Sequence, residues 1–183
     1  MQKIYFMSKQ FSDLGINKSL QQGLAHLQIS VPTDIQEKTI PLVLNQTEDL
    51  VAVAKTGTGK TAAFGIPLLQ LIDTDNTNVQ VVILAPTREL GQQIHANLVS
   101  YAAKIPSISI AAICGGIPIK PQIERLKTPT HIVVATPGRL VDLINRGALN
   151  TKTIAYLVLD EADEMVSALK QDLDLIIKAI PKT

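Results

Sequence analysis

Apolar residues along this chain gather in five short, continuous runs rather than in an alternating pattern. Runs of this length that are rich in valine and isoleucine indicate strands buried on both faces of a sheet. The expected strands are Leu50–Val53, Val79–Ala85, Ile108–Ile113, Ile132–Ala135 and Tyr156–Leu159.

Helical periodicity fills most of the intervals between these runs, because apolar residues there recur every three to four positions. The expected helices are Asn17–Leu27, Thr33–Leu44, Lys60–Ile72, Thr87–Ala103, Pro118–Arg125, Gly138–Arg146 and Lys170–Ala179. Thr33 is expected to cap its helix, and Pro41 to kink or end it. Alternating strands and helices predict an α/β fold, a doubly wound, mostly parallel sheet with helices on both faces.

Composition narrows the class of protein further. The chain has 183 residues, 46% of them hydrophobic, and Lys+Arg 17 against Asp+Glu 16 give a net charge of +1. A nucleic-acid site would therefore be local, built from backbone amides and a few arginines. Cys114 is the only cysteine, which excludes an internal disulfide and fits a reducing compartment.

Neither a membrane span nor a signal peptide is evident, since no apolar run approaches the roughly 18 residues that a span needs. These features predict a cytoplasmic protein without a membrane partner. We expect residues 1–10 to be a disordered or vector-derived tail, and residues 11–183 to form one domain.

Residues 54–61, Ala-Lys-Thr-Gly-Thr-Gly-Lys-Thr, lie between an expected strand and an expected helix. This is the context of a phosphate-binding P-loop, although Ala54 stands where the usual pattern has its first glycine. Lys60 would reach the β- and γ-phosphates of ATP, and the Thr61 hydroxyl would ligate Mg²⁺. The residues of this loop expected to contact the nucleotide are Thr56, Gly57, Thr58, Gly59, Lys60 and Thr61. The alternative is a chance glycine turn.

Four residues follow the last expected strand: Asp160, Glu161, Ala162 and Asp163. Carboxylates at the carboxyl end of such a strand suit a P-loop enzyme, with Asp160 holding Mg²⁺ partly through water. Glu161 would orient or deprotonate an attacking water. The alternative is an acidic first turn of a helix, since Asp and Glu are favoured there.

These four residues spell the name of the DEAD-box RNA helicases, and further motifs resemble that family in the same order. Residues 32–36 resemble its glutamine motif with Phe11 upstream, and residues 86–90 resemble its motif Ia. Gly115-Gly116 and residues 136–139 resemble its RNA-facing motifs. The resemblance implies a RecA-like fold and ATP-dependent remodelling of RNA duplexes.

The resemblance also implies roles for single residues. Gln36 would pair its amide with the adenine edge of ATP, and Phe11 would stack on the base. Without the resemblance, the sequence would predict Gln36 to be a residue on the surface of a helix and Phe11 to be an aromatic residue of the core. Asp163 would couple the ATP site to the second lobe. The expected contacts to the RNA backbone are Pro86, Thr87, Arg88, Gly115, Gly116, Thr136, Pro137, Gly138 and Arg139. The alternative for the turns at Thr87 and Thr136 is a pair of capped helices with solvated arginines.

Some features depart from the family pattern. Gln28 takes a position that is often glycine. The Ser-Ala-Thr motif and the C-terminal RecA-like lobe, which supplies an arginine finger, are not among these residues. We therefore expect a monomeric fragment that binds nucleotide, hydrolyses ATP very slowly and does not unwind RNA.

Three other functions compete with this interpretation. A DNA helicase or translocase would share the P-loop, but the glutamine motif and the acidic tetrad argue against it. A regulatory GTPase would need an Asn-Lys-x-Asp signature after the P-loop, and none follows it. A non-catalytic RNA-binding scaffold would not need Lys60, Thr61, Asp160 and Glu161 together.

Overall fold

The computed structural model describes residues 9–45, 49–55 and 57–181. The described chain divides into two compact units. The first runs through Leu71 and includes Ser100–Ile105, and the second comprises Ile72–Val99 and the chain from Pro106 onward.

The second unit is built on a four-stranded sheet in the order β2-β3-β1-β4. Every neighbouring pair of strands is parallel. The strands are β1 (Val81–Leu84), β2 (Ile110–Ile113), β3 (Ile132–Ala135) and β4 (Tyr156–Leu159). All residues of β1 and β3 are buried, whereas all four of β4 are half-buried, because β1 is the one partner of β4 among the described strands. The predicted α/β class and parallel sheet are confirmed.

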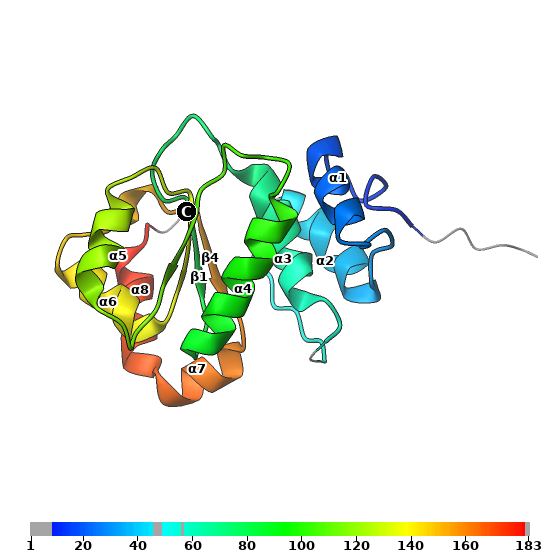
Figure 1. The fold of residues 1–183 in the computed structure, drawn as a ribbon. Helices are drawn as coiled ribbons and strands as arrows, with labels where there is room; N and C mark the ends of the chain where they lie inside the picture. Colours follow the sequence, from blue (N-terminus) through cyan, green and yellow to red (C-terminus); the bar gives the residue numbers. More distant parts are fainter. Residues whose placement is uncertain (1–8, 46–48, 56, 182–183) are drawn as a thin grey trace, which may run out of the picture. The chain divides into compact units, whose positions relative to one another are not determined.

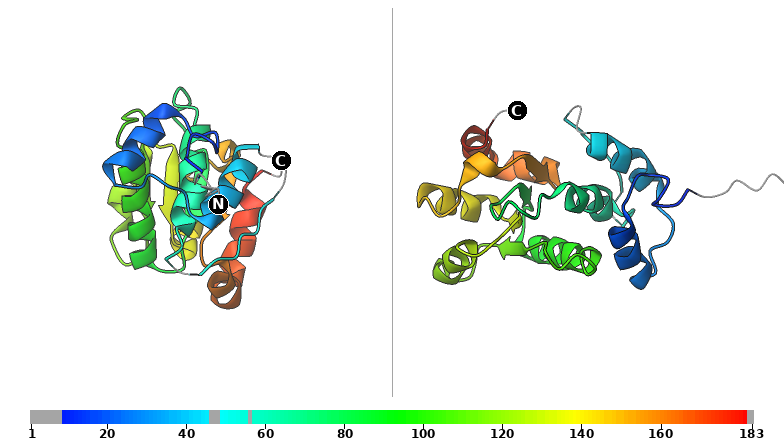
Figure 2. Two further views of the ribbon diagram at one scale, coloured as in Figure 1. Left: turned by 90° about the vertical axis from the view of Figure 1, so that its right-hand side faces the viewer. Right: turned by 90° about the horizontal axis from the view of Figure 1, so that it is seen from above.

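Helices pack on both faces of this sheet (Figures 1 and 2). One face bears α5 (Ile119–Leu126), α6 (Pro137–Asn145) and α8 (Lys170–Ala179), whose apolar residues join those of β1, β2 and β3 in one core. The other face bears α4 (Arg88–Tyr101), where the Cα of Gly91 comes close enough that a Cβ would lie 3.0 Å from Cys114 Sγ. Parallel strands buried on both faces explain the continuous apolar runs in the sequence.

The first unit contains α1 (Lys18–His26), α2 (Asp34–Asn45) and α3 (Lys60–Leu71). Its core includes fully buried leucines and isoleucines from all three helices. The Gln70 side chain accepts a hydrogen bond from Asn17 N at 2.7 Å and donates one to Gly15 O at 2.9 Å, which ties α3 to the segment before α1. Pro41 lies inside α2 and does not end it, contrary to one of the two expected outcomes.

Gln28 adopts a left-handed conformation, with φ of 60°, just after α1. Gln28 N donates to Ala25 O and Ile29 N donates to Leu24 O, which is the hydrogen-bond pattern of a Schellman C-cap. That cap favours glycine because a Cβ is strained at positive φ. The expectation of glycine at this position therefore has a physical basis, and the glutamine is strained there.

The predicted strand Leu50–Val53 is wrong. The segment has no strand structure, and Val51 and Val53 are 89% and 92% exposed. A strand needs a neighbour to take up its backbone hydrogen bonds, and no described strand pairs with this segment. Two elements were not predicted: the 3₁₀ helix Thr151–Thr153 and α7 (Ala162–Ala168). No helix in the described ranges is both long and apolar enough to cross a bilayer.

Candidate nucleotide and RNA sites

The predicted P-loop retains its glycine-dependent geometry although the strand before it is absent. Gly57 and Gly59 have φ of 82° and 90°, a region that glycine enters without strain. Thr58 N and Oγ1 both donate to Lys55 O, at 3.4 and 2.7 Å, and so form a turn. α3 begins at Lys60, and both Lys60 and Thr61 are half-buried in its first turn. Thr56 lies outside the described residues.

Gln36 lies in the first turn of α2 and is 3% exposed, so it is not the surface residue that its isolated sequence context suggests. Its Oε1 accepts from Thr33 N at 3.0 Å, which is half of a capping box. Thr33 occupies the cap position of α2, as expected. Its carbonyl accepts the first hydrogen bond of the helix, from Glu37 N at 2.9 Å.

The same two side chains bind the P-loop. Gln36 Nε2 donates to Gly59 O at 3.2 Å, and Thr33 Oγ1 donates to Thr58 O at 2.9 Å. These bonds fix the start of α2 to the loop that the sequence predicts to hold phosphate. A primary amide has two N–H donors and two acceptor lone pairs. The bonds that Gln36 makes among the described residues use one donor and one acceptor, which leaves one of each.

Phe11 is 4% exposed, and its carbonyl accepts hydrogen bonds from Leu14 N and Ile16 N. Its ring belongs to the core of the first unit, as the alternative interpretation of this residue supposed. Stacking of Phe11 on a nucleotide base stays a prediction.

The acidic tetrad follows β4 in the second unit. Asp160 is buried, and its N–H donates to Leu84 O at 3.0 Å, which extends the β1–β4 pairing by one residue. Glu161 has φ of 53° and ψ of 51°, a left-handed conformation that is uncommon for a residue with a Cβ. Residues held in sparsely populated conformations cluster at functional sites. Asp163 is exposed in the first turn of α7, so the tetrad also begins a helix.

The structure brings together most of the residues predicted to face RNA. They follow β1, β2 and β3 at the carboxyl edge of the sheet. Thr87 caps α4, since Leu90 N donates to its Oγ1 at 3.2 Å. Thr136 occupies the cap position of α6, but its Oγ1 instead accepts from Gly115 N at 3.1 Å and so joins two of these loops.

Two arginines and one carboxylate surround these loops. Arg88 Nη1 lies 3.5 Å from the position that a Cβ on Gly116 would take. Arg139 Nη2 donates to Ile117 O at 2.9 Å. Burial raises the pKa of the neighbouring Cys114 thiol, while the Arg88 and Arg139 guanidiniums act in the opposite direction. Asp172 Oδ2 lies 3.3 Å from the Cβ position of Gly138, which adds a negative charge at this edge.

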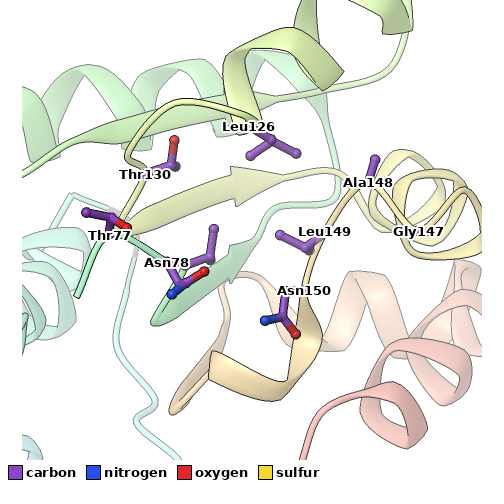
Figure 3. Close-up of a pocket in the computed structure, with 9 residues that line it drawn as sticks. Thr77, Asn78, Leu126, Thr130, Gly147, Ala148, Leu149 and Asn150 are labelled. Atoms are coloured by element: carbon purple, nitrogen blue, oxygen red, sulfur yellow. The ribbon is translucent and has the colours of Figure 1, made fainter.

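A separate cavity of about 250 Å³ lies where the strands begin (Figure 3). Its wall contains neither a charged side chain nor any residue predicted to act on nucleotide or RNA. The nine lining residues are Thr77, Asn78, Val79, Leu126, Thr130, Gly147, Ala148, Leu149 and Asn150. We assign it no part in the candidate sites.

Sequence reasoning missed two polar contacts that organise these sites. The Thr33 hydroxyl bonds to the P-loop rather than to its own helix, and the buried Gln122 bonds to both Cys114 O and Arg139. A capping-box pattern, Thr33 with Gln36 three residues later, predicts the bond from Thr33 N to Gln36 Oε1 but not the bond from the Thr33 hydroxyl to the P-loop. No sequence signal marks Gln122, because its partners are distant along the chain.

The first unit thus carries a glycine loop that opens α3, and the second carries an acidic tetrad after β4. A family profile described as DEAD/DEAH box helicase matches residues 33–183. The chain therefore belongs to the DEAD/DEAH box helicase family and corresponds to the N-terminal, RecA-like lobe.

Individual relatives agree with this assignment. A protein of Methanocaldococcus jannaschii named "Probable ATP-dependent RNA helicase" is 43% identical over 173 residues, which cover 94% of this chain and 46% of the relative. The "DEAD-box ATP-dependent RNA helicase CshA" of Geobacillus kaustophilus is 41% identical over 172 residues, which cover 93% of this chain and 36% of the relative. The chain thus spans less than half the length of these relatives.

Solved structures show the same fold. A DEAD box protein from Methanococcus jannaschii superposes with a TM-score of 0.89 at 42% identity, covering 94% of this chain and 47% of that one. Dbp5 of S. cerevisiae, solved bound to RNA and ADP BeF3, superposes with a TM-score of 0.87 at 30% identity, covering 96% of this chain and 44% of that one.

Proposed function

We propose that this chain is the ATP-binding lobe of an RNA helicase that couples ATP binding and hydrolysis to local unwinding of RNA duplexes. The observation that carries the proposal is the bonding of Gln36 to the P-loop. The bonds to Thr33 N and Gly59 O use one acceptor and one donor of the Gln36 amide, so a second acceptor and a second donor remain for a ligand. Adenine presents N7 as an acceptor and N6 as a donor, which match that pair, whereas guanine presents an oxygen in place of the amino group.

The nucleotide would bind together with Mg²⁺. Thr61 of the first unit offers a hydroxyl and Asp160 of the second unit offers a carboxylate, the oxygen ligands that Mg²⁺ prefers, and each would hold the ion directly or through water. The bound ion would neutralise charge on the phosphate oxygens. The positive φ of Gly57 and Gly59 lets backbone N–H groups turn toward a phosphate, and Lys60 adds a positive charge at the start of α3.

Glu161 would orient the attacking water and accept its proton as the water oxygen bonds to the γ-phosphorus and ADP leaves. Its left-handed backbone supports this role, because that conformation places a strained acidic residue directly after β4. Asp163, exposed in the first turn of α7, would couple these events to a second lobe.

RNA would be held through its backbone at the carboxyl edge of the sheet. Arg88, Arg139 and the backbone of the Gly115-Gly116 and Pro137-Gly138 turns would contact phosphates, and Pro86 and Thr87 would shape the first loop. Such contacts are largely independent of sequence, and the RNA 2′-hydroxyl adds selectivity against DNA.

The complete reaction would need a C-terminal RecA-like lobe, since this chain spans less than half the length of these relatives. An arginine finger from such a lobe is worth about 10³–10⁵ in rate. The 183 residues alone would bind adenine nucleotide as a monomer and hydrolyse ATP very slowly.

Unwinding of a short RNA duplex tests the proposal. We would compare this chain alone with the longest reading frame that contains it, each with ATP and with GTP. The proposal expects ATP-dependent unwinding by the long protein only, and loss of it in Glu161→Gln with nucleotide binding retained. Unwinding of DNA but not RNA by the long protein would favour the competing DNA translocase.

A further inference from the structure

Gln122 is a buried polar side chain on α5, 5% exposed, that lies outside every motif identified in the sequence. Its Nε2 donates to Cys114 O at 3.0 Å, and its Oε1 accepts from Arg139 Nη1 at 2.8 Å. One side chain thus joins the loop after β2 to the first turn of α6. Both of those segments belong to the proposed RNA surface.

Two further bonds complete this arrangement. Arg139 Nη2 donates to Ile117 O at 2.9 Å, and Gly115 N donates to Thr136 Oγ1 at 3.1 Å. The loop of residues 114–117, named here the diglycine loop, is therefore fixed at three points. Gly116 within it has φ of 77° and lies beside the Arg88 guanidinium. Gly116 and Ile117 of this loop are exposed, so these bonds rather than burial hold that half of the loop in place.

Arg139 itself is partly committed to this arrangement. A guanidinium has five N–H donors, and two of its nitrogens already donate to Gln122 Oε1 and Ile117 O. Its planar fork suits two acceptors held at fixed positions. Removing Gln122 would free one arm of this fork and leave the carbonyl of Cys114, a buried residue, without this donor.

We infer that Gln122 is a positioning residue for RNA binding, which holds the diglycine loop against the first turn of α6 so that Arg88 and the loop amides meet the RNA backbone together. Arg139 acts chiefly by bracing this loop, and its contact with phosphate is secondary. The inference rests on the proposed function, because it names how that RNA surface is ordered. It adds a residue to which no motif assigned a role.

Three variants of this chain separate positioning from general stability. Gln122→Met keeps the length of the side chain and removes both bonds, whereas Gln122→Glu keeps the acceptor for Arg139 and removes the donor to Cys114 O. The control is Arg125→Met on the same helix. Arg125 donates to Thr128, Pro129, Thr130 and Ser109, none of which belongs to the proposed RNA surface.

Two readouts apply to each variant: amide hydrogen exchange of the diglycine loop and of residues 136–139, and the Kd for a fluorescent single-stranded decauridine at low salt. We expect Gln122→Met to accelerate exchange in both segments and to weaken RNA binding about tenfold, the loss expected for two hydrogen bonds that order a binding loop. Gln122→Glu should fall between it and the wild type, and Arg125→Met should change neither readout more than about twofold.

Unchanged exchange in Gln122→Met, or an equal loss of RNA affinity in Arg125→Met, would overturn the inference. If the wild-type chain does not bind decauridine, the RNA surface itself falls with the proposed function. The exchange result still decides in that case whether Gln122 braces the loop, so the two failures are distinguishable.

Discussion

Replacing Gly59 with alanine tests the link between the P-loop and the glutamine motif. An alanine Cβ built at Gly59 would fall on Gln36 Nε2, inside van der Waals contact, whereas a Cβ at Gly57 meets nothing within 4 Å. Both glycines have similar φ, 90° and 82°. The pair of variants therefore shares the backbone strain and differs in the clash.

The magnitude follows from these two contributions. Left-handed backbone costs a residue with a Cβ roughly 1–2 kcal/mol, and alanine recovers about 0.5–1 kcal/mol because it is less flexible than glycine when unfolded. Gly57→Ala should therefore destabilise the chain by about 1 kcal/mol. In Gly59→Ala, Gln36 must also move, and it would lose its bonds to Thr33 N and Gly59 O. At about 1 kcal/mol for each bond, the total loss should be about 3 kcal/mol.

The assay is urea unfolding of each variant without nucleotide, repeated in a Gln36→Ala background. With the glutamine side chain removed, Gly59→Ala should cost no more than Gly57→Ala, which gives an interaction energy of about 2 kcal/mol. Equal destabilisation by the two alanines in the wild-type background would refute the reasoning. An undiminished cost of Gly59→Ala in the Gln36→Ala background would also refute it.

Other parts of the structure yield three further predictions. Gln28→Gly should raise the free energy of unfolding by about 0.5–1 kcal/mol by relieving the left-handed strain after α1, and loss of stability in chemical denaturation would contradict the Schellman cap. Burial lowers the pKa of His131, with the Asp73 carboxylate opposing this in part, so the unfolded chain binds the proton first as pH falls below about 6.5. The free energy of unfolding should then fall with decreasing pH, by at most about 1.4 kcal/mol per pH unit for one proton. His131→Asn keeps an acceptor for Ser109 N and should remove that part of the pH dependence. An unchanged pH profile in this variant would exclude His131 as its source. Asp172→Asn removes the carboxylate beside Gly138 and should tighten decauridine binding by about two- to fivefold at low salt. Added salt should diminish this effect. Unaltered binding would show that phosphates do not approach that turn.

Local sequence signals predicted the sheet well, because β1, β2 and β3 are buried or mostly buried strands and their residues are all valine, isoleucine, leucine or alanine. They failed for Leu50–Val53, since an apolar run becomes a strand only when another strand pairs with it. The capping of α4 by Thr87 was predictable from neighbouring residues. The contacts of Thr136 with Gly115 and of Gln122 with Arg139 join segments 17 to 21 residues apart, and no local pattern encodes them.

The central claim is that Gln36 reads adenine beside the P-loop. Its most direct test is calorimetric titration of the chain with ADP and GDP in Mg²⁺, for the wild type and for Gln36→Ala. The account predicts that the wild type prefers ADP and that this preference disappears in Gln36→Ala, with GDP affinity changing little. Equal binding of ADP and GDP by the wild type, or an ADP preference that survives in Gln36→Ala, would contradict it.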